Sequence, residues 1–244
     1  MILYVNGDSH SAGAEAVNAY CFAEDDLKYR TLGRLPHPDN LEVSYGQVLA
    51  DRMNCQLHCD AESASSNHRI IRTTWEYFTR VRGLPYGAQA DFVIIGWSTW
   101  ERKEFQDPAT GIKWQVNAGG VGEDWPLWLK EQYPKYVSEL DWANEMRQAH
   151  SKVHQFHLDL KRHGIRHLFF NTYSYFDAEQ LGQTYTWDNS YLEPYNSRGT
   201  YYEWCIDKGF KPVSKNSYHF GADAHRAWAD HLYAQIIQLC LTQK

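Results

Sequence analysis

The chain of 244 residues lacks features that mark several large classes of protein. Basic residues are the minority, with 24 lysines and arginines against 30 acidic residues and a formal net charge of −6. This balance argues against nonspecific binding to a nucleic-acid backbone, which requires a basic surface. No apolar run approaches the ~18 residues of a membrane span. The start, Met1–Val5, is too short and has no basic lead, so it does not predict a secretory signal.

Cysteine is scarce and its spacing predicts no disulfide framework. There are five cysteines, an odd number, and no Cys-x-x-Cys pair. Cys55 and Cys59 flank an expected strand, and extended chain would hold them too far apart to bridge. We therefore expect reduced thiols and a reducing compartment.

The sequence also predicts no metal and no cofactor. His150, His154 and His157 recur on one expected helix, but the pattern lacks the glutamate of His-Glu-x-x-His and lies beside an apolar stripe. We interpret the three histidines as a solvated flank of an amphipathic helix. A flavin- or nucleotide-binding domain is disfavoured because no glycine-rich phosphate loop follows the first apolar run.

Aromatic residues are abundant instead, with 17 Tyr, 10 Trp and 10 Phe, and some of them are expected to line a cleft. The segment Thr99–Leu140 is rich in glycine and proline and contains Trp114, Trp125 and Trp128. It is too long for a plain connection. We expect an irregular, aromatic-rich insertion that covers the ligand edge of the domain.

Short apolar runs alternate with helical patterns along a single expected domain, residues 1–244. Strands are expected around Leu3–Val5, Gln56–Cys59, Asp91–Gly96, Arg166–Asn171 and, weakened by Pro212, Phe210–Val213. Helices are expected over Val43–Met53, Asn67–Val81, Trp142–His163 and Ala222–Leu241. Alternating strands and helices predict an α/β fold with a parallel sheet covered on both faces, and ligands bind such sheets at the carboxyl ends of the strands.

Two segments carry residues suited to nucleophilic catalysis. Gly7-Asp8-Ser9-His10 ends the first strand, where a tight turn would expose the Ser9 hydroxyl at the carboxyl edge. His219 lies in the loop before the last helix, which should reach the same edge. Each signal alone is weak, since the first also fits a helix-capping turn and the second a solvated histidine. Together they predict a serine nucleophile with a histidine base.

With these residues the chain resembles the SGNH (GDSL-like) hydrolase superfamily, particularly its compact members in phage genomes. The resemblance implies a three-layer, flavodoxin-like fold with a five-stranded parallel sheet, and hydrolysis of acyl or acetyl esters of lipids or sugars. It also implies an oxyanion hole from the N–H groups of Ser9 and of Ala64 or Ser65, with Ser98. Ala64 or Ser65 stands where the family has glycine, a change that a backbone donor tolerates if φ is ordinary there.

Two positions depart from the family pattern. Ser98 replaces the asparagine of the third block, and Asn67 or Asn171 could substitute as donor. Asn216 replaces the aspartate of Asp-x-x-His, so it could orient His219 but not stabilise an imidazolium by charge. The hydrolase would then be slow or specialised. The alternative is a binding or structural module that keeps the fold, for example a virion component.

Other features carry less information. His225 is a possible auxiliary to the site, although a structural role is favoured. The arginines after Asn67, Arg69, Arg72, Arg80 and Arg82, could contact an anion or form a plain helix surface. We expect a small-molecule or glycan ester as partner, no nucleic acid, and a cytoplasmic or virion-associated protein.

Overall fold

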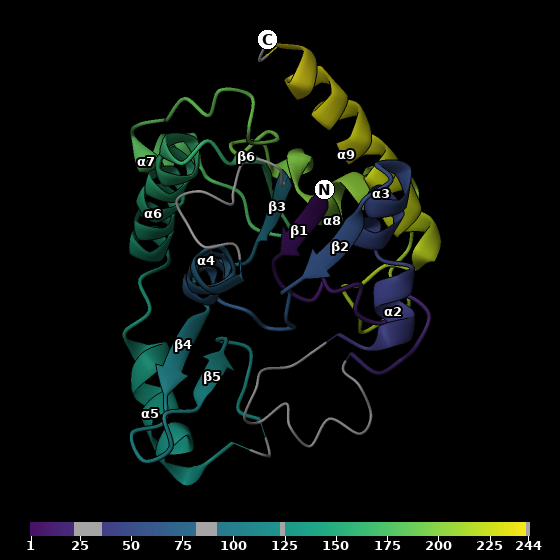
Figure 1. Ribbon diagram of the computed structural model, residues 1–244. Coiled ribbons are helices and arrows are strands. Elements are labelled where there is room, and N and C mark those ends of the chain that lie inside the picture. Colours follow the sequence, from purple (N-terminus) through teal and green to yellow (C-terminus); the bar gives the residue numbers. More distant parts are fainter. Residues whose placement is uncertain (22–35, 82–91, 123–124, 243–244) are drawn as a thin grey trace.

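The computed structural model describes residues 1–21, 36–81, 92–122 and 125–242 (Figure 1). Its main sheet has four parallel strands: β1 (Ile2–Asn6), β2 (Gln56–Cys59), β3 (Phe92–Trp97) and β6 (Arg166–Asn171). Their spatial order is β2-β1-β3-β6. Because all four strands run in one direction, their carboxyl ends share one edge. The predicted α/β fold with a covered parallel sheet is confirmed.

Helices cover both faces of this sheet (Figure 1). The main ones are α3 (Tyr45–Arg52), α4 (Asn67–Glu76), α6 (Trp142–Arg162) and α9 (Ala222–Thr242). Alternate residues of β1 enter different cores: Leu3 and Val5 pack with α3 and α9, whereas Tyr4 packs with α4 and α6. This follows from the two-residue period of a strand. Shorter helical elements are α2 (Pro38–Glu42), η1 (Tyr77–Val81), α7 (Ala178–Leu181), η3 (Ser197–Gly199) and α8 (Tyr201–Asp207).

Local chemistry sets the ends of the helices. The side chains of Ser66 and Asp141 accept hydrogen bonds from the first turns of α4 and α6. Gly164, with φ of 68°, follows α6 in the left-handed conformation that glycine adopts without strain. The four predicted helices are confirmed: the first corresponds to α3, and the second continues beyond α4 as η1.

The fifth strand was expected around Phe210–Val213, and the described residues contain no strand there. Pro212 makes only an isolated antiparallel bridge with Phe220. The reason is that proline has no N–H to donate to a ladder. The free edge of β6 is instead covered by Ser190–Leu192, where Phe169 N donates to Ser190 O and Leu192 N donates to Phe169 O.

The insertion Thr99–Leu140 is more regular than its glycines and prolines predict. It forms the antiparallel hairpin β4 (Lys103–Gln106) and β5 (Lys113–Val116), followed by the helix α5 (Leu127–Ser138), which tolerates Pro134. Its aromatic residues pack mainly on one another around Val116, Trp125 and Leu129. The expectation of irregular structure is therefore wrong, because this segment has regular elements and a small core of its own. That it covers the ligand edge stays a prediction.

The histidines of α6 are also placed differently from the prediction. His150 and His157 are 1% and 0% exposed. Aromatic residues beyond β6 cover them: His150 stacks on Tyr185, and His154 lies 3.8 Å from the same ring. A solvated flank is therefore wrong for His150 and His157, because a distant segment of the chain packs over that side of the helix. Among the described residues, no helix is both long and apolar enough to cross a membrane.

Candidate functional site

The turn after β1 is held rigidly at the carboxyl edge of the sheet. The Asn6 side chain donates to Thr73 Oγ1 at 2.8 Å and accepts from Gly7 N at 2.8 Å. At Gly7 there is no room for a side chain, since a Cβ would collide with Ser11 Oγ and lie 2.7 Å from the Gly96 carbonyl oxygen. Glycine is therefore required where the chain turns toward Ser9.

The Asp8 carboxylate connects the loops that follow three strands, β1, β3 and β6. Its carboxylate accepts from Arg102 at 3.3 Å, from Thr172 Oγ1 at 2.9 Å and from His10 N at 3.1 Å. Arg102 follows β3 and Thr172 follows β6, so one buried carboxylate holds the loops beside Ser9 in register. Since Asp8 is 1% exposed, its charge depends on Arg102 for compensation.

Ser9 is positioned as the predicted nucleophile would be, in the turn directly after β1. It is 7% exposed, and its carbonyl accepts from Ala14 N at 3.0 Å. Within the described part of the chain, neither the Ser9 hydroxyl nor Nε2 of His219 has a hydrogen-bond partner. The structure therefore shows no hydrogen bond between Ser9 Oγ and His219 Nε2, and their direct contact during a reaction stays a prediction.

His219 lies against the loop that carries Ser9. Its ring is 5.2 Å from the ring of His10, edge to face, and its Nδ1 lies 2.5 Å from Oε2 of Glu15. Asn216, expected to orient this histidine, is exposed and makes no hydrogen bond to it among the described residues. The reason is that the loop turns the His219 ring toward Glu15, while Asn216 faces solvent.

Two further histidines close to His219, His10 and His225, are buried. Burial lowers the pKa of His10 to about 4 and that of His225 to about 3. His225 Nδ1 accepts from Tyr45 N at 3.3 Å, and its ring stacks near Tyr45. Both rings are therefore neutral near pH 7, and the contact of His225 with the Tyr45 backbone fits a structural residue.

The backbone N–H groups expected in an oxyanion hole, those of Ser9, Ala64 and Ser65, differ in whether they already have an acceptor. Ser65 N already donates to Glu62 O at 3.0 Å. The N–H groups of Ser9 and Ala64 have no acceptor in the described part of the chain. Ala64 has φ of 66°, so the condition of an ordinary φ is not met there. This left-handed conformation explains why a glycine suits the position.

The side-chain donors differ in availability. Ser98 is fully buried, and its hydroxyl accepts from Arg102 at 2.8 Å, which leaves its own proton free to donate. Asn67 exchanges two hydrogen bonds with the Ser98 backbone, at 2.9 and 3.0 Å. Asn171 is held by Tyr191 and by the Pro194 carbonyl. Ser98 is thus the most available of these donors, and the two asparagines mainly support the loops.

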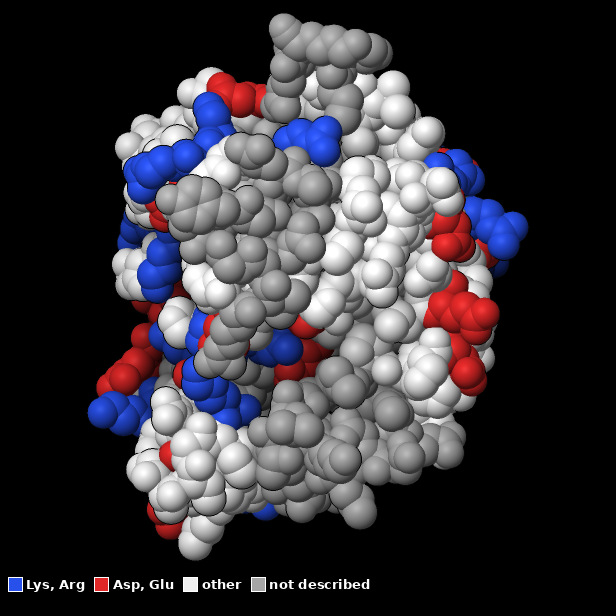
Figure 2. All heavy atoms as spheres, viewed as in Figure 1, with Lys and Arg blue, Asp and Glu red and all other residues white. Residues whose placement is uncertain are grey.

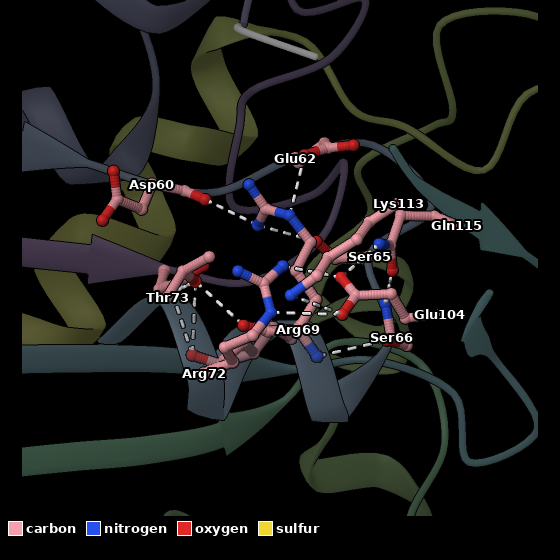
Figure 3. Close-up of polar contacts among 12 residues, drawn as sticks. Asp60, Glu62, Ser65, Ser66, Arg69, Arg72, Thr73, Glu104, Lys113 and Gln115 are labelled. Carbon is pink, nitrogen blue, oxygen red and sulfur yellow. Dashed lines mark hydrogen bonds and ion pairs between the residues drawn. The ribbon is translucent and has the colours of Figure 1, made fainter. Parts of the chain in front are cut away.

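The arginines of α4 turn toward acidic partners (Figure 3). Arg69 Nε pairs with Glu62 at 2.7 Å, and its Nη1 donates to Ser65 Oγ at 3.0 Å. Arg72 pairs with Glu104 of the hairpin at 2.7 Å. The first arginine therefore braces the loop that carries Ala64, and the second anchors the insertion. The side chain of Arg80 and the whole of Arg82 lie outside the described part of the chain.

A cavity of about 330 Å³ lies between α4, α6 and the hairpin. Its lining includes Asn67 and Arg102, which contact Ser98 and Asp8, and Trp100 contributes an apolar wall. Neither Ser9 nor His219 lines this cavity. Acidic and basic side chains are intermingled on the side of the molecule that carries α6 and the hairpin (Figure 2).

One group of side chains has donors close enough to hold a metal ion. Oxygen, sulfur and nitrogen atoms of Glu15, Cys21 and His219 lie within 4.8 Å of one another. However, the Glu15–His219 separation of 2.5 Å fits a shared proton. Two ligands of a tetrahedral zinc ion would be roughly 3.3 Å apart. The geometry therefore favours a hydrogen bond over coordination.

No family model matches the chain, and no curated protein matches its sequence. In structure, the chain is similar to known esterases. One is a carbohydrate esterase whose active site displays divergent catalytic and non-catalytic binding functions, with 14% identity and a TM-score of 0.42 over 97% of this chain and 64% of that one. Another is an acetyl xylan esterase from Butyrivibrio proteoclasticus, with 12% identity and a TM-score of 0.41 over 96% and 62%.

A third similar structure is a lipolytic protein of the G-D-S-L family from Desulfitobacterium hafniense, with 10% identity and a TM-score of 0.39 over 96% of this chain and 98% of that one. The chain spans less than two thirds of the length of the two esterases above.

Two residues of the site escaped the reasoning from sequence. Glu15 lies only six residues after Ser9, but no periodicity links it to His219, from which 204 positions separate it. Arg102 is the second, because its bond to Asp8 needs the sheet to bring the ends of β1 and β3 together. Looking in the sequence for an acidic residue shortly after Ser9 would have suggested Glu15.

Proposed function

We propose that this chain is a serine ester hydrolase that removes an acyl or acetyl group from a lipid or sugar. Ser9 is the nucleophile, and His219 is the general base. The observation that carries this proposal is the hydrogen bond from His219 Nδ1 to a carboxylate of the nucleophile loop. It leaves Nε2 as the nitrogen that can take a proton, beside the loop whose turn bears Ser9.

In the first half of the reaction, Ser9 Oγ attacks the ester carbonyl while His219 Nε2 accepts the hydroxyl proton. The tetrahedral intermediate then collapses, and the same imidazolium gives its proton to the departing alcohol. In the second half, His219 activates a water molecule, which attacks the acyl-serine and releases the acid. Ser9 recovers its proton at the end, so the enzyme is unchanged.

The negative charge of the intermediate would be stabilised by the N–H groups of Ser9 and Ala64 and by the Ser98 hydroxyl. Donors that are already fixed need no reorganisation during the reaction, and loss of one such donor costs roughly 10²–10³ in turnover. Ser98 is a shorter donor than asparagine, so we expect modest turnover.

The test is labelling with a serine-reactive fluorophosphonate, followed by peptide mapping. We expect a single modified peptide containing Ser9, and no labelling of Ser9→Ala. Ser11→Ala serves as a matched control on the same loop, and it should still be labelled. If the wild type is not labelled, or Ser9→Ala hydrolyses an activated ester at the wild-type rate, the hydrolase proposal fails and a binding module is favoured.

A further inference from the structure

The carboxylate of Glu15 joins the nucleophile loop to the histidine loop. Its Oε2 lies 2.5 Å from His219 Nδ1 and accepts from Ser217 Oγ at 2.6 Å. Ser217 Oγ in turn accepts from His219 N at 3.0 Å. One oxygen atom therefore fixes both the ring and the backbone of the residue that we assign as the base.

We propose that Glu15 is the positioning residue of His219, supplied by the nucleophile's own loop in place of the acid that is missing at Asn216. This inference rests on the proposed function. Asn216 lies three residues before His219, where an aspartate would orient the ring from the same loop, but it is exposed to solvent. Glu15 reaches the ring from the loop that carries Ser9.

The backbone at Glu15 supports a functional assignment. Its φ is 60°, in the left-handed region that a residue with a side chain adopts only at a cost. Strained conformations of this kind persist where the surrounding structure requires them, and they gather at functional sites. Here the conformation accompanies a carboxylate that bridges two loops.

The charge of the carboxylate suits the role. Partial burial acts to raise the pKa of Glu15, but the hydrogen bonds from Ser217 and His219 outweigh it and hold the pKa below its usual value. A charged Glu15 would fix the Nδ1–H tautomer and stabilise the imidazolium that forms when Ser9 gives up its proton. In the part of the chain that the structure describes, His10, Cys21 and His225 are further ionisable groups close to His219.

The experiment compares four forms of the full chain: wild type, Glu15→Gln, Glu15→Gly and Asn216→Ala. Glutamine keeps the size of the side chain and removes its charge. Glycine removes the side chain and accepts the left-handed backbone, so it tests the role even if the first variant folds poorly. Asn216→Ala is the matched control, because it removes the residue that stands at the usual acid position.

Two rates are measured across pH 5–9: fluorophosphonate labelling of Ser9 and hydrolysis of an activated acetyl ester. We expect both Glu15 variants to be slower by roughly 10²–10⁴-fold, with the lower pH limit of the rate profile moved downward. Asn216→Ala should stay within about threefold of the wild type. Glu15 variants that keep the wild-type rate and profile would overturn the inference.

An NMR measurement of the His219 ring separates this inference from the proposed function. It needs no turnover, so it is informative even if Ser9 proves not to be a nucleophile. With Glu15→Gln, the signal of the Nδ1 proton should move, because its hydrogen bond to a charged carboxylate is lost. Identical ring signals in the two forms would show that Glu15 does not act on His219, whatever the outcome of the labelling.

Discussion

Replacing Ala64 with glycine should stabilise this protein, although the change removes a methyl group. Ala64 has φ of 66°, where a Cβ crowds the backbone at a cost of about 1–2 kcal/mol. Glycine relieves that strain, but it also raises the conformational entropy of the unfolded chain, which lowers the gain in stability by about 0.4–1 kcal/mol. The net expectation is a rise of about 0.5–1 kcal/mol in the free energy of unfolding.

Urea denaturation and thermal melting measure this difference, and a chain of this size should gain about 1–4 °C. Ala234→Gly is the control, since Ala234 is an exposed residue inside α9, where glycine should destabilise by about 0.5–1 kcal/mol. Opposite signs for the two substitutions would support the reasoning. If Ala64→Gly destabilises as the control does, the left-handed conformation is not the source of the strain.

Three other perturbations have defined outcomes. Burial lowers the pKa of His157 to about 4 and that of His167 to about 3, whereas histidines in the unfolded chain titrate near pH 6.5. As the pH falls below 6.5 the unfolded chain therefore binds protons first, and the free energy of unfolding should fall by several kcal/mol toward pH 4. Denaturation at a series of pH values measures this slope, which His167→Gln should reduce. Arg102→Ala should lower the free energy of unfolding by about 2–4 kcal/mol, because it leaves the buried Asp8 carboxylate unpaired. Adding Asp8→Asn to this variant should recover part of the loss. If the effects of the two substitutions are simply additive in the double-mutant cycle, the ion pair is contradicted. A chelator should leave both the melting temperature and the rate of Ser9 labelling unchanged, whereas a lower melting temperature would point to a bound metal.

The sequence predicted the central strands β1 and β3 well because they are short, apolar and buried. Phe92–Trp97 is a continuous apolar run, and all six residues are buried. Such a run needs no knowledge of its neighbours. The expected strand near Phe210 failed for the opposite reason, since pairing at the sheet edge depends on donors that Pro212 does not have.

Burial of polar residues was harder to predict. His150 and His157 look like a polar flank of α6 because histidine counts as polar in a helical pattern. Their burial depends on Tyr185 and Trp187, which come from a different segment of the chain. Nothing in the period of the helix encodes that cover. The same limit applies to the φ of Ala64, which results from the surrounding loop.

The position of the carboxylate decides how tightly nucleophile and base are coupled. An acid three residues before His219 would hold the ring against the histidine's own loop. The distance from the ring to Ser9 would then still depend on how the histidine loop packs against the serine loop. Glu15 belongs to the serine loop, so its bond to His219 constrains that distance directly. The histidine loop is braced on its other side, where Val213 N donates to His219 O at 2.9 Å. In the proposed mechanism, an acid on the serine loop therefore changes which loop positions the base, and the missing aspartate does not by itself predict an inactive protein.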